Sequence, residues 1–239
     1  MTARFSFRVA GWAGWSDGVD ALQIGGAAEM PGGLPLSVRR RVSPVGRRAL
    51  EAAMAVLPAA VSAGCDQPRI ILASRHGEYG RSFRLLNELV DSGEVSPADF
   101  SMAVHHGLAG LLSIQTGNRA GHSAIAAGPD TAGFALLEAA ACLSERPDPV
   151  LVICFDEPLP GIYEPVASGQ EAACVLALVL LSADADSGEL IHTDMVPADG
   201  MAATGELAAS LLSLLATGAR SAQASGPRMS WSWNRAEPA

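Results

Sequence analysis

Two adjacent histidines, His105 and His106, are the residues of this chain best suited to acid–base chemistry. With Glu78 or Asp156 as a carboxylate partner, either could serve as the general base of a small hydrolase or decarboxylase. Neighbouring residues point to different sides of the element that holds them, so the two rings cannot act as one unit. No serine or cysteine lies in a G-x-S-x-G-like context that would supply a nucleophile. A hydrogen-bonded structural role is therefore the favoured interpretation of each histidine.

Cysteine and histidine spacing does not indicate a metal site. His122 and His192 have no partner at metal-ligand spacing, so we expect neither a zinc site nor a cofactor. The cysteines have no C-x-x-C spacing and no disulfide-dense pattern. We expect all four to be reduced core residues: Cys65, Cys142, Cys154 and Cys174.

The charge balance excludes several classes of function. The formal charge is −9, and all 16 basic residues are arginine. An acidic chain without a broad basic surface is not expected to bind nucleic acid. The absence of lysine rules out Schiff-base chemistry and a P-loop lysine. The basic concentration at Arg39, Arg40, Arg41, Arg47 and Arg48 could meet an acidic partner, although a solvated surface cluster is the favoured interpretation.

The chain is long enough to bury the core of one domain, which we expect to span residues 1–239. Its longest apolar run, residues 172–181, is about half of the roughly 20 residues that cross a bilayer. The N-terminus lacks an apolar stretch followed by a cleavage site. We therefore expect a soluble cytoplasmic protein that has no contact with a membrane.

The elements that would hold these residues follow an α/β order. Apolar or alternating runs predict strands at residues 5–15, 69–73, 123–127, 150–155 and 172–181, and an edge strand at 229–233. Serine caps followed by proline, together with alanine- and leucine-rich runs, predict helices at 45–57, 83–90, after Ser96, at 131–143 and at 204–216. Strand 123–127, helix 131–143 and strand 150–155 would form a βαβ unit in a buried parallel sheet. Asp130 would cap the helix that follows it.

Residues 109–119 read AGLLSIQTGNR, and residues 124–127 read AIAA. These segments resemble the part of the β-ketoacyl synthases that leads to their nucleophile, where A-G-x-x-[ST]-I-x-x-G-x-R precedes a strand and then T-A-C-x-x-G opens a helix. The resemblance covers roughly residues 5–183. It implies an α/β, thiolase-like fold reduced to its N-terminal half, with a mixed, mostly parallel sheet packed with helices. Half of this fold would expose apolar surface, so we expect stability mainly in complex with a partner.

The departures from the family bear on function. Without a gap, the catalytic cysteine position of the family falls on Pro129, which supplies no nucleophile. The two family histidines come from a C-terminal half that this chain lacks. We therefore expect a pseudo-enzyme rather than a condensing enzyme.

Truncated homologues without a nucleophile resemble the chain-length-factor subunits of type II fatty acid, polyketide and aryl-polyene-like pathways. The resemblance implies a heterodimer with a full-length β-ketoacyl synthase, in which this subunit shapes the acyl tunnel and the acyl carrier protein docks mainly on the active subunit. His76, Tyr79 and Phe83 are spaced to share one helical face and would close the tunnel, although an ordinary packing role is equally open. The strand that pairs across the dimer would be Ser123, Ala124, Ile125, Ala126 and Ala127. A homodimeric acyl-binding module is a further alternative.

Overall fold

The computed structural model of the protein describes residues 2–166, 172–198 and 206–236. Within them the chain forms one nine-stranded sheet in the order β4-β3-β5-β6-β1-β7-β9-β8, with β2 paired to β1. The strands are β1 (Ala3–Ser16), β2 (Gln23–Gly26), β3 (Arg69–Ala73), β4 (His122–Ile125), β5 (Val150–Asp156), β6 (Cys174–Ser182), β7 (Glu189–Pro197), β8 (Ser221–Ser225) and β9 (Met229–Arg235). The helices are α1 (Leu36–Arg39), α2 (Pro44–Ser62), α3 (Tyr79–Ser92), α4 (Pro97–Ala103), α5 (Gly107–Thr116), α6 (Thr131–Glu145), α7 (Leu207–Thr217) and the 3₁₀ helix η1 (Gly161–Val166).

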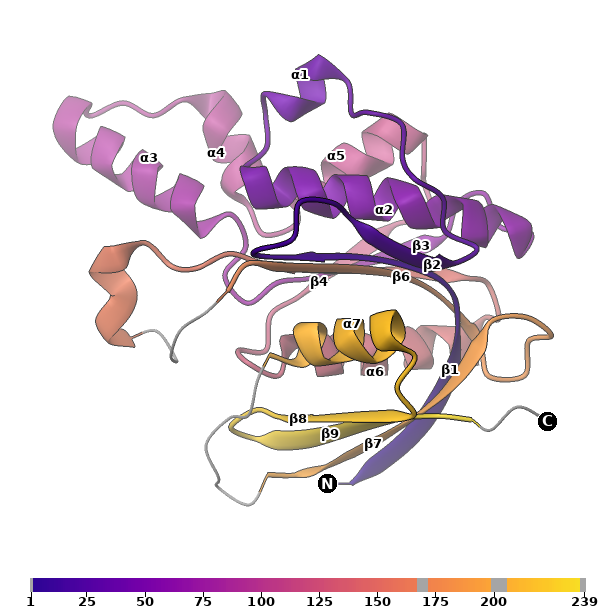
Figure 1. The fold of residues 1–239 in the computed structure, drawn as a ribbon. Helices are drawn as coiled ribbons and strands as arrows, with labels where there is room; N and C mark the ends of the chain where they lie inside the picture. The colour runs from indigo at the N-terminus through magenta and orange to yellow at the C-terminus, as the bar shows by residue number, and fades with distance from the viewer. Residues whose placement is uncertain (1, 167–171, 199–205, 237–239) are drawn as a thin grey trace.

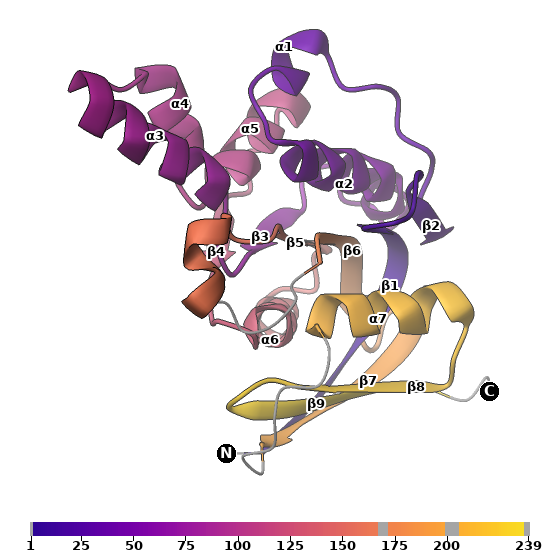
Figure 2. The same cartoon turned by 60° about the vertical axis from the view of Figure 1, so that its left-hand side comes forward.

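The sheet folds back on itself because β1 belongs to two layers. The first half of β1 pairs with β7, and its second half pairs with β6. In Figure 1, α1 to α5 lie above the upper layer, α6 and α7 lie beneath it, and β7, β8 and β9 form a lower layer under α6 and α7. Figure 2 shows the same arrangement from a second side. The layers therefore alternate as helix, sheet, helix and sheet.

The strands β5 and β6 form the buried centre of the upper layer. Along β6, the odd-numbered residues 175–181 join the core beneath α2, and the even-numbered leucines 176–180 join the core around α6 and α7. Both faces of this strand are thus covered by helices. This burial explains the continuous apolar run from which the strand was predicted.

The lower layer has one apolar and one polar face. Trp231 and Trp233 of β9 are buried in the core around α6 and α7, whereas Ser230, Ser232 and Asn234 alternate with them and are half-buried on the other face. Strands β7, β8 and β9 thus cover the helical layer with a sheet whose outer face is polar. Strands β7 and β8, which no sequence pattern predicted, pair with β9 to complete this layer. The expectation that the fold exposes apolar surface and is stable mainly with a partner names no side of the molecule and stays a prediction.

The pairing directions refine the predicted fold class. The βαβ unit is confirmed, since β4 and β5 both pair in parallel with β3 and are connected through α6. All other pairings are antiparallel, because β6 and β1 run against their neighbours and β7, β8 and β9 pair only antiparallel. The sheet is therefore mixed, as predicted, but less parallel than expected. Among the described residues, no helix is long and apolar enough to cross a membrane.

Candidate functional site

The turn between β4 and α6 is a tight strand-to-helix elbow that contains Pro129. Gly128 has a positive φ of 63°, a conformation that suits glycine. The Ala127 N–H donates to Oγ1 of Thr131 at 2.9 Å, and the Thr131 hydroxyl donates to the Gly128 carbonyl at 2.6 Å. These bonds close the elbow around Pro129, which carries no nucleophilic atom. Strand β4 therefore leads through this elbow into helix α6, in the order predicted from residues 123–143.

Asp130 lies at the elbow with a fully buried side chain. Its carboxylate makes no capping bond to α6, so the predicted cap is wrong. Oδ1 accepts the indole N–H of Trp231 at 3.0 Å, and Oδ2 lies 3.7 Å from Nε of Arg228. A Cβ on Gly226 would lie 2.3 Å from Oδ1, so the hairpin turn approaches this closely only with glycine. The contacts of both carboxylate oxygens are therefore with the β8–β9 hairpin and not with α6.

The first turn of α6 is covered by the Trp231 indole. A Cβ on Gly133 would lie 2.3 Å from the indole, and the Phe134 ring packs edge-on against it with centroids 5.4 Å apart. The Arg228 guanidinium lies 5.5 Å from the centre of the Phe134 ring and donates to the Ala127 carbonyl at 3.0 Å. The β8–β9 hairpin therefore closes over the elbow.

A second polar group lies where β3 and β5 end. The Asp156 carboxylate accepts the Ser74 hydroxyl at 2.9 Å, the Arg75 N–H at 2.8 Å and the His76 N–H at 3.1 Å. Burial nevertheless raises the pKa of Asp156 above its ordinary value, although these hydrogen bonds oppose the shift. His105 donates from Nε2 to the Ser74 carbonyl at 2.7 Å. These contacts fix the turn after β3 and give His105 the structural role favoured from the sequence.

The alternative enzyme hypothesis needs a histidine paired with Glu78 or Asp156. His105 bonds a backbone carbonyl instead, and the His106 ring is stacked on His122 with centroids 5.6 Å apart. Within the described contacts, neither histidine forms a dyad with either carboxylate.

Arg81 joins α3 to three other parts of the molecule. Nη1 lies 2.5 Å from Asp99 of α4, Nε lies 3.5 Å from Glu78, and Nη2 donates to the Arg41 carbonyl at 2.8 Å. Glu78 also accepts the Ser43 hydroxyl at 2.8 Å, which connects the group to the cap of α2. This buried cation therefore sets the position of the projecting helices α3 and α4 seen in Figures 1 and 2.

The three predicted tunnel residues are only partly brought together. Tyr79 and Phe83 lie on α3, but His76 lies in the turn before it, so the prediction that all three share a helical face is wrong. Gly77 has a positive φ of 62°, and its N–H donates to the Ser74 hydroxyl, which delays the start of the helix to Tyr79. Tyr163 of η1 packs edge-on against Tyr79 and Phe83, with centroids 5.1 and 5.8 Å apart. A single tyrosine in an irregular segment gave no sequence signal for this contact.

The predicted interface strand lies at one edge of the sheet and is shorter than expected. Ser123, Ala124 and Ile125 belong to β4, while Ala126 and Ala127 follow it. The Ile70 N–H donates to the Gly121 carbonyl, and the Ser74 N–H donates to the Ile125 carbonyl. The backbone N–H and C=O groups of the odd-numbered residues of this segment therefore point towards β3. The backbone groups of residues 122, 124 and 126 therefore point away from the sheet. Such an edge is a template for pairing with another chain.

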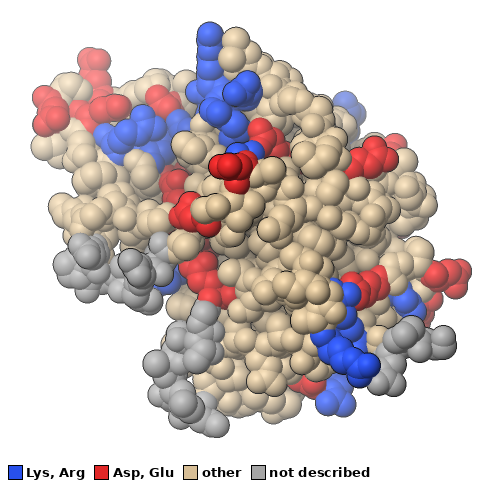
Figure 3. Space-filling model, in the orientation of Figure 1, with Lys and Arg blue, Asp and Glu red and all other residues tan. Residues whose placement is uncertain are grey.

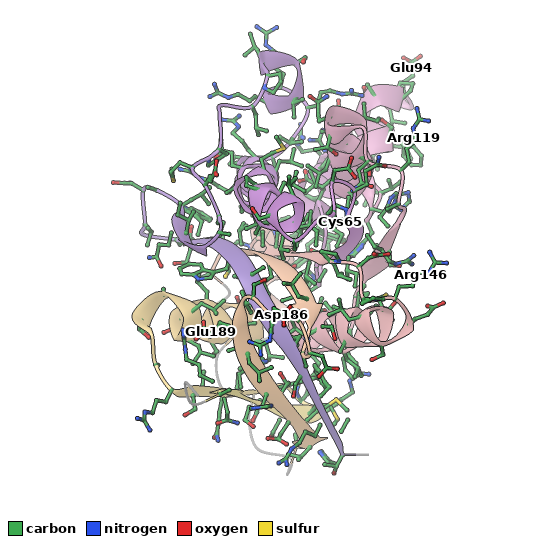
Figure 4. The ribbon with its side chains drawn as sticks, turned by 90° about the vertical axis from the view of Figure 1, so that its right-hand side faces the viewer. Cys65, Glu94, Arg119, Arg146, Asp186 and Glu189 are labelled. Carbon is green, nitrogen blue, oxygen red and sulfur yellow. The ribbon has the colours of Figure 1, made fainter. Side chains whose placement is uncertain are left out.

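The cysteines lie away from the elbow. Cys154 and Cys174 are buried, and burial raises the pKa of Cys174 to about 12, so that its thiol stays protonated. Cys65 and Cys142 are half-buried and line a hollow of about 340 Å³ beside Arg69 and Arg146, at the amino-terminal ends of β3 and β5. Figure 4 shows Cys65 and Arg146 on this side. No three potential ligands in the described segments are placed to hold a metal ion.

The predicted basic cluster divides into two parts. Arg39, Arg40 and Arg41 are exposed, and Figure 3 shows basic side chains gathered over α1. Arg48 instead forms an ion pair with Glu51 at 3.1 Å and lies over the ring of Trp15. Part of the cluster thus belongs to the fold, and part faces solvent.

The fold and its elbow define an α/β protein of the thiolase-like class. The sequence profile of the β-ketoacyl synthase N-terminal domain matches residues 12–234, so the chain belongs to the β-ketoacyl synthase family. This match extends past residue 183, where the predicted resemblance ended, and includes the lower layer. No curated protein matches the sequence.

Solved structures share this fold. A ketosynthase (ApeO) in complex with its chain length factor (ApeC) from Xenorhabdus doucetiae is similar with a TM-score of 0.78 and 21% identity, over 96% of this chain and 99% of that chain. The ishigamide ketosynthase/chain length factor has a TM-score of 0.53 and 14% identity, over 81% of this chain and 67% of that chain. A type II PKS acyl-carrier protein in complex with its ketosynthase, AntDE:AntF, has a TM-score of 0.56 and 14% identity, over 75% of this chain and 64% of that chain.

Proposed function

We propose that this chain is a non-catalytic, chain-length-factor-like subunit that pairs with an active β-ketoacyl synthase in a type II, aryl-polyene-like pathway. The observation that carries the proposal is the elbow. A condensing enzyme needs a thiolate at the N-terminus of this helix. This chain has Pro129 there, with the β8–β9 hairpin packed on the elbow through Asp130 and Trp231.

The extent of the structural matches is in keeping with the same function. This chain and the matched chain of the ApeO–ApeC complex cover each other almost completely, whereas the chains of the ishigamide and AntDE:AntF structures are longer. The active partner would supply the nucleophile and the histidines.

The edge strand β4 supplies a surface for the partner. Its outward backbone groups fit an added strand from the ketosynthase, which would extend the sheet across the heterodimer. The aromatic group of Tyr79, Phe83 and Tyr163 would lie at the end of the acyl tunnel, and the carrier protein would dock mainly on the active subunit.

Co-expression with a full-length partner β-ketoacyl synthase tests the assembly. We expect a 1:1 complex burying more than roughly 2,000 Å², as obligate interfaces do. Ala126→Arg adds an unpaired charge to the edge and should separate the subunits, whereas Ala21→Arg, at an exposed site in the β1–β2 connection, should not. A monomer that ignores the ketosynthase in a pull-down would overturn the assembly.

Catalysis is tested by replacing the cysteines of one subunit at a time. A complex in which all four cysteines of this chain are replaced by alanine should still condense, after its integrity has been checked. Replacing the partner's active-site cysteine alone should abolish condensation. The non-catalytic role would be refuted if condensation survived replacement of the partner's active-site cysteine but was abolished by replacement of this chain's cysteines.

A further inference from the structure

The strand β8 is the second edge of the sheet, at the end opposite β4. Among the described residues it pairs with β9 alone. Its five residues read Ser-Ala-Gln-Ala-Ser and include no proline and no charge. Proline, charge and bulges are the usual means by which proteins protect an edge from pairing. This edge has none of them within the strand.

The backbone of β8 presents a defined set of outward groups. The Arg235 N–H donates to the Arg220 carbonyl, and the Gly226 N–H donates to the Met229 carbonyl, both at 2.9 Å. In an antiparallel pair these groups alternate, so the even-numbered residues 220–226 bond β9. The N–H and C=O groups of Ser221, Gln223 and Ser225 therefore point away from the sheet.

The sequence of β8 is the same in both directions, with Gln223 at its centre. A two-fold axis at Gln223 places Ser221 opposite Ser225 of a second copy and each Gln223 opposite the other. These are the residues whose backbone groups point outward. The pairs that the two-fold axis places opposite one another are therefore pairs that can hydrogen-bond. From this agreement we propose that β8 pairs antiparallel with β8 of a second copy of this chain.

The pairing would join the lower layers of two molecules into one continuous sheet. The three opposed pairs would form six backbone hydrogen bonds, two for each pair. The contact area is small compared with the roughly 1,600 Å² of a standard stable interface, so the dimer should depend on protein concentration. Since β4 lies at the other end of the sheet, this contact leaves the proposed ketosynthase interface free.

Register-specific cross-linking tests the pairing, on the chain alone or in complex with its partner. In a hydrogen-bonded pair the two residue 223 Cα atoms lie about 5.5 Å apart, within disulfide range. Gln223→Cys should therefore give a symmetric cross-linked dimer under mild oxidation. Ser221→Cys is the matched control, because the two copies of residue 221 would lie about 13 Å apart along the strands. The unmodified chain controls for cross-links through Cys65 and Cys142. Equal cross-linking of the two variants, or none by Gln223→Cys, overturns the proposal.

Charge complementation tests it without oxidation. Gln223→Lys and Gln223→Glu each place like charges opposite one another, so each variant alone should lose the concentration-dependent rise in mass seen by light scattering for the unmodified chain. An equimolar mixture should regain it, because lysine then faces glutamate. Circular dichroism checks that both variants are folded. The proposal is overturned if either variant shows the same mass as the unmodified chain, or if the mass does not recover on mixing. It is also overturned if the unmodified chain is monomeric at every concentration.

Discussion

Trp231 donates its indole N–H to the buried carboxylate of Asp130 at 3.0 Å, across a separation of 101 residues. This bond connects the last strand of the chain to the first turn of α6. It explains why the elbow tolerates a buried acid, since Arg228 approaches the second carboxylate oxygen. The lower layer is therefore part of the domain and holds the elbow closed.

Asp130→Ala should lower the free energy of unfolding by about 1–3 kcal/mol, because it leaves the buried indole N–H without an acceptor. Asp130→Asn keeps an acceptor oxygen and should cost less. Urea unfolding of the two variants measures the difference. An Asp130→Ala protein as stable as the unmodified chain would mean that the hydrogen bond contributes nothing.

Gly133→Ala should destabilise the protein by about 1–3 kcal/mol, because the new Cβ would lie 2.3 Å from the Trp231 indole. Gly110→Ala is the matched control in α5, where a Cβ meets nothing within 4 Å. That change should stabilise the protein by about 0.4–1 kcal/mol, since alanine restricts the unfolded chain. Opposite signs in thermal unfolding are expected, and equal effects would contradict the close packing at Gly133.

Arg81→Ala should cost about 3–5 kcal/mol, because it leaves the buried Glu78 carboxylate without its cation. It should also increase hydrogen exchange in α3 and α4, which Arg81 joins through Asp99. Arg84→Ala, on an exposed face of the same helix, should change neither measurement. Unchanged exchange in α4 of Arg81→Ala would show that other contacts position these helices.

The pH dependence of stability should reveal the acidic group near α3. Burial, followed by the charge of Glu78, raises the pKa of Glu157 above its ordinary value of 4.5. The folded protein therefore binds this proton more tightly than the unfolded chain does, so this contribution to stability grows as pH falls through the raised pKa and is complete below the ordinary one. The unfolding free energy of the unmodified chain, minus that of Glu157→Gln, should be larger at about pH 5 than at about pH 7. A flat or reversed difference would contradict the raised pKa.

The upper layer could be predicted from the sequence, whereas the contacts that close the site could not. Strands β5 and β6 are continuous apolar runs, and the elbow carries a local motif. The sequence predicts Asp130 as a helix cap because capping involves residues that are close in the sequence. Its observed partners, Arg228 and Trp231, are distant in the sequence and approach Asp130 only in the folded sheet. His76 was assigned to a helix because spacing does not reveal the positive φ of Gly77 or the bonds to Asp156 that hold the turn.

The last prediction connects the aromatic group to product length. If the proposed tunnel ends at Tyr79, Phe83 and Tyr163, their packed rings set a hard limit on the acyl chain. Removing one ring opens volume that a longer chain can fill at about 0.8 kcal/mol per buried methylene. Phe83→Ala and Tyr163→Ala, in an intact complex with the ketosynthase, should therefore shift carrier-bound products towards longer chains.

Both rings are half-buried, so each variant should cost at most about 3 kcal/mol of stability, and the integrity of the complex must be measured first. Leu86→Ala, further along α3 at a side chain that is 52% exposed, is the control for loss of apolar bulk and should leave the products unchanged. Mass analysis of the carrier-bound products separates the possibilities. An unchanged length distribution in both aromatic variants would make these rings ordinary packing residues, because a tunnel wall cannot lose a ring without gaining depth.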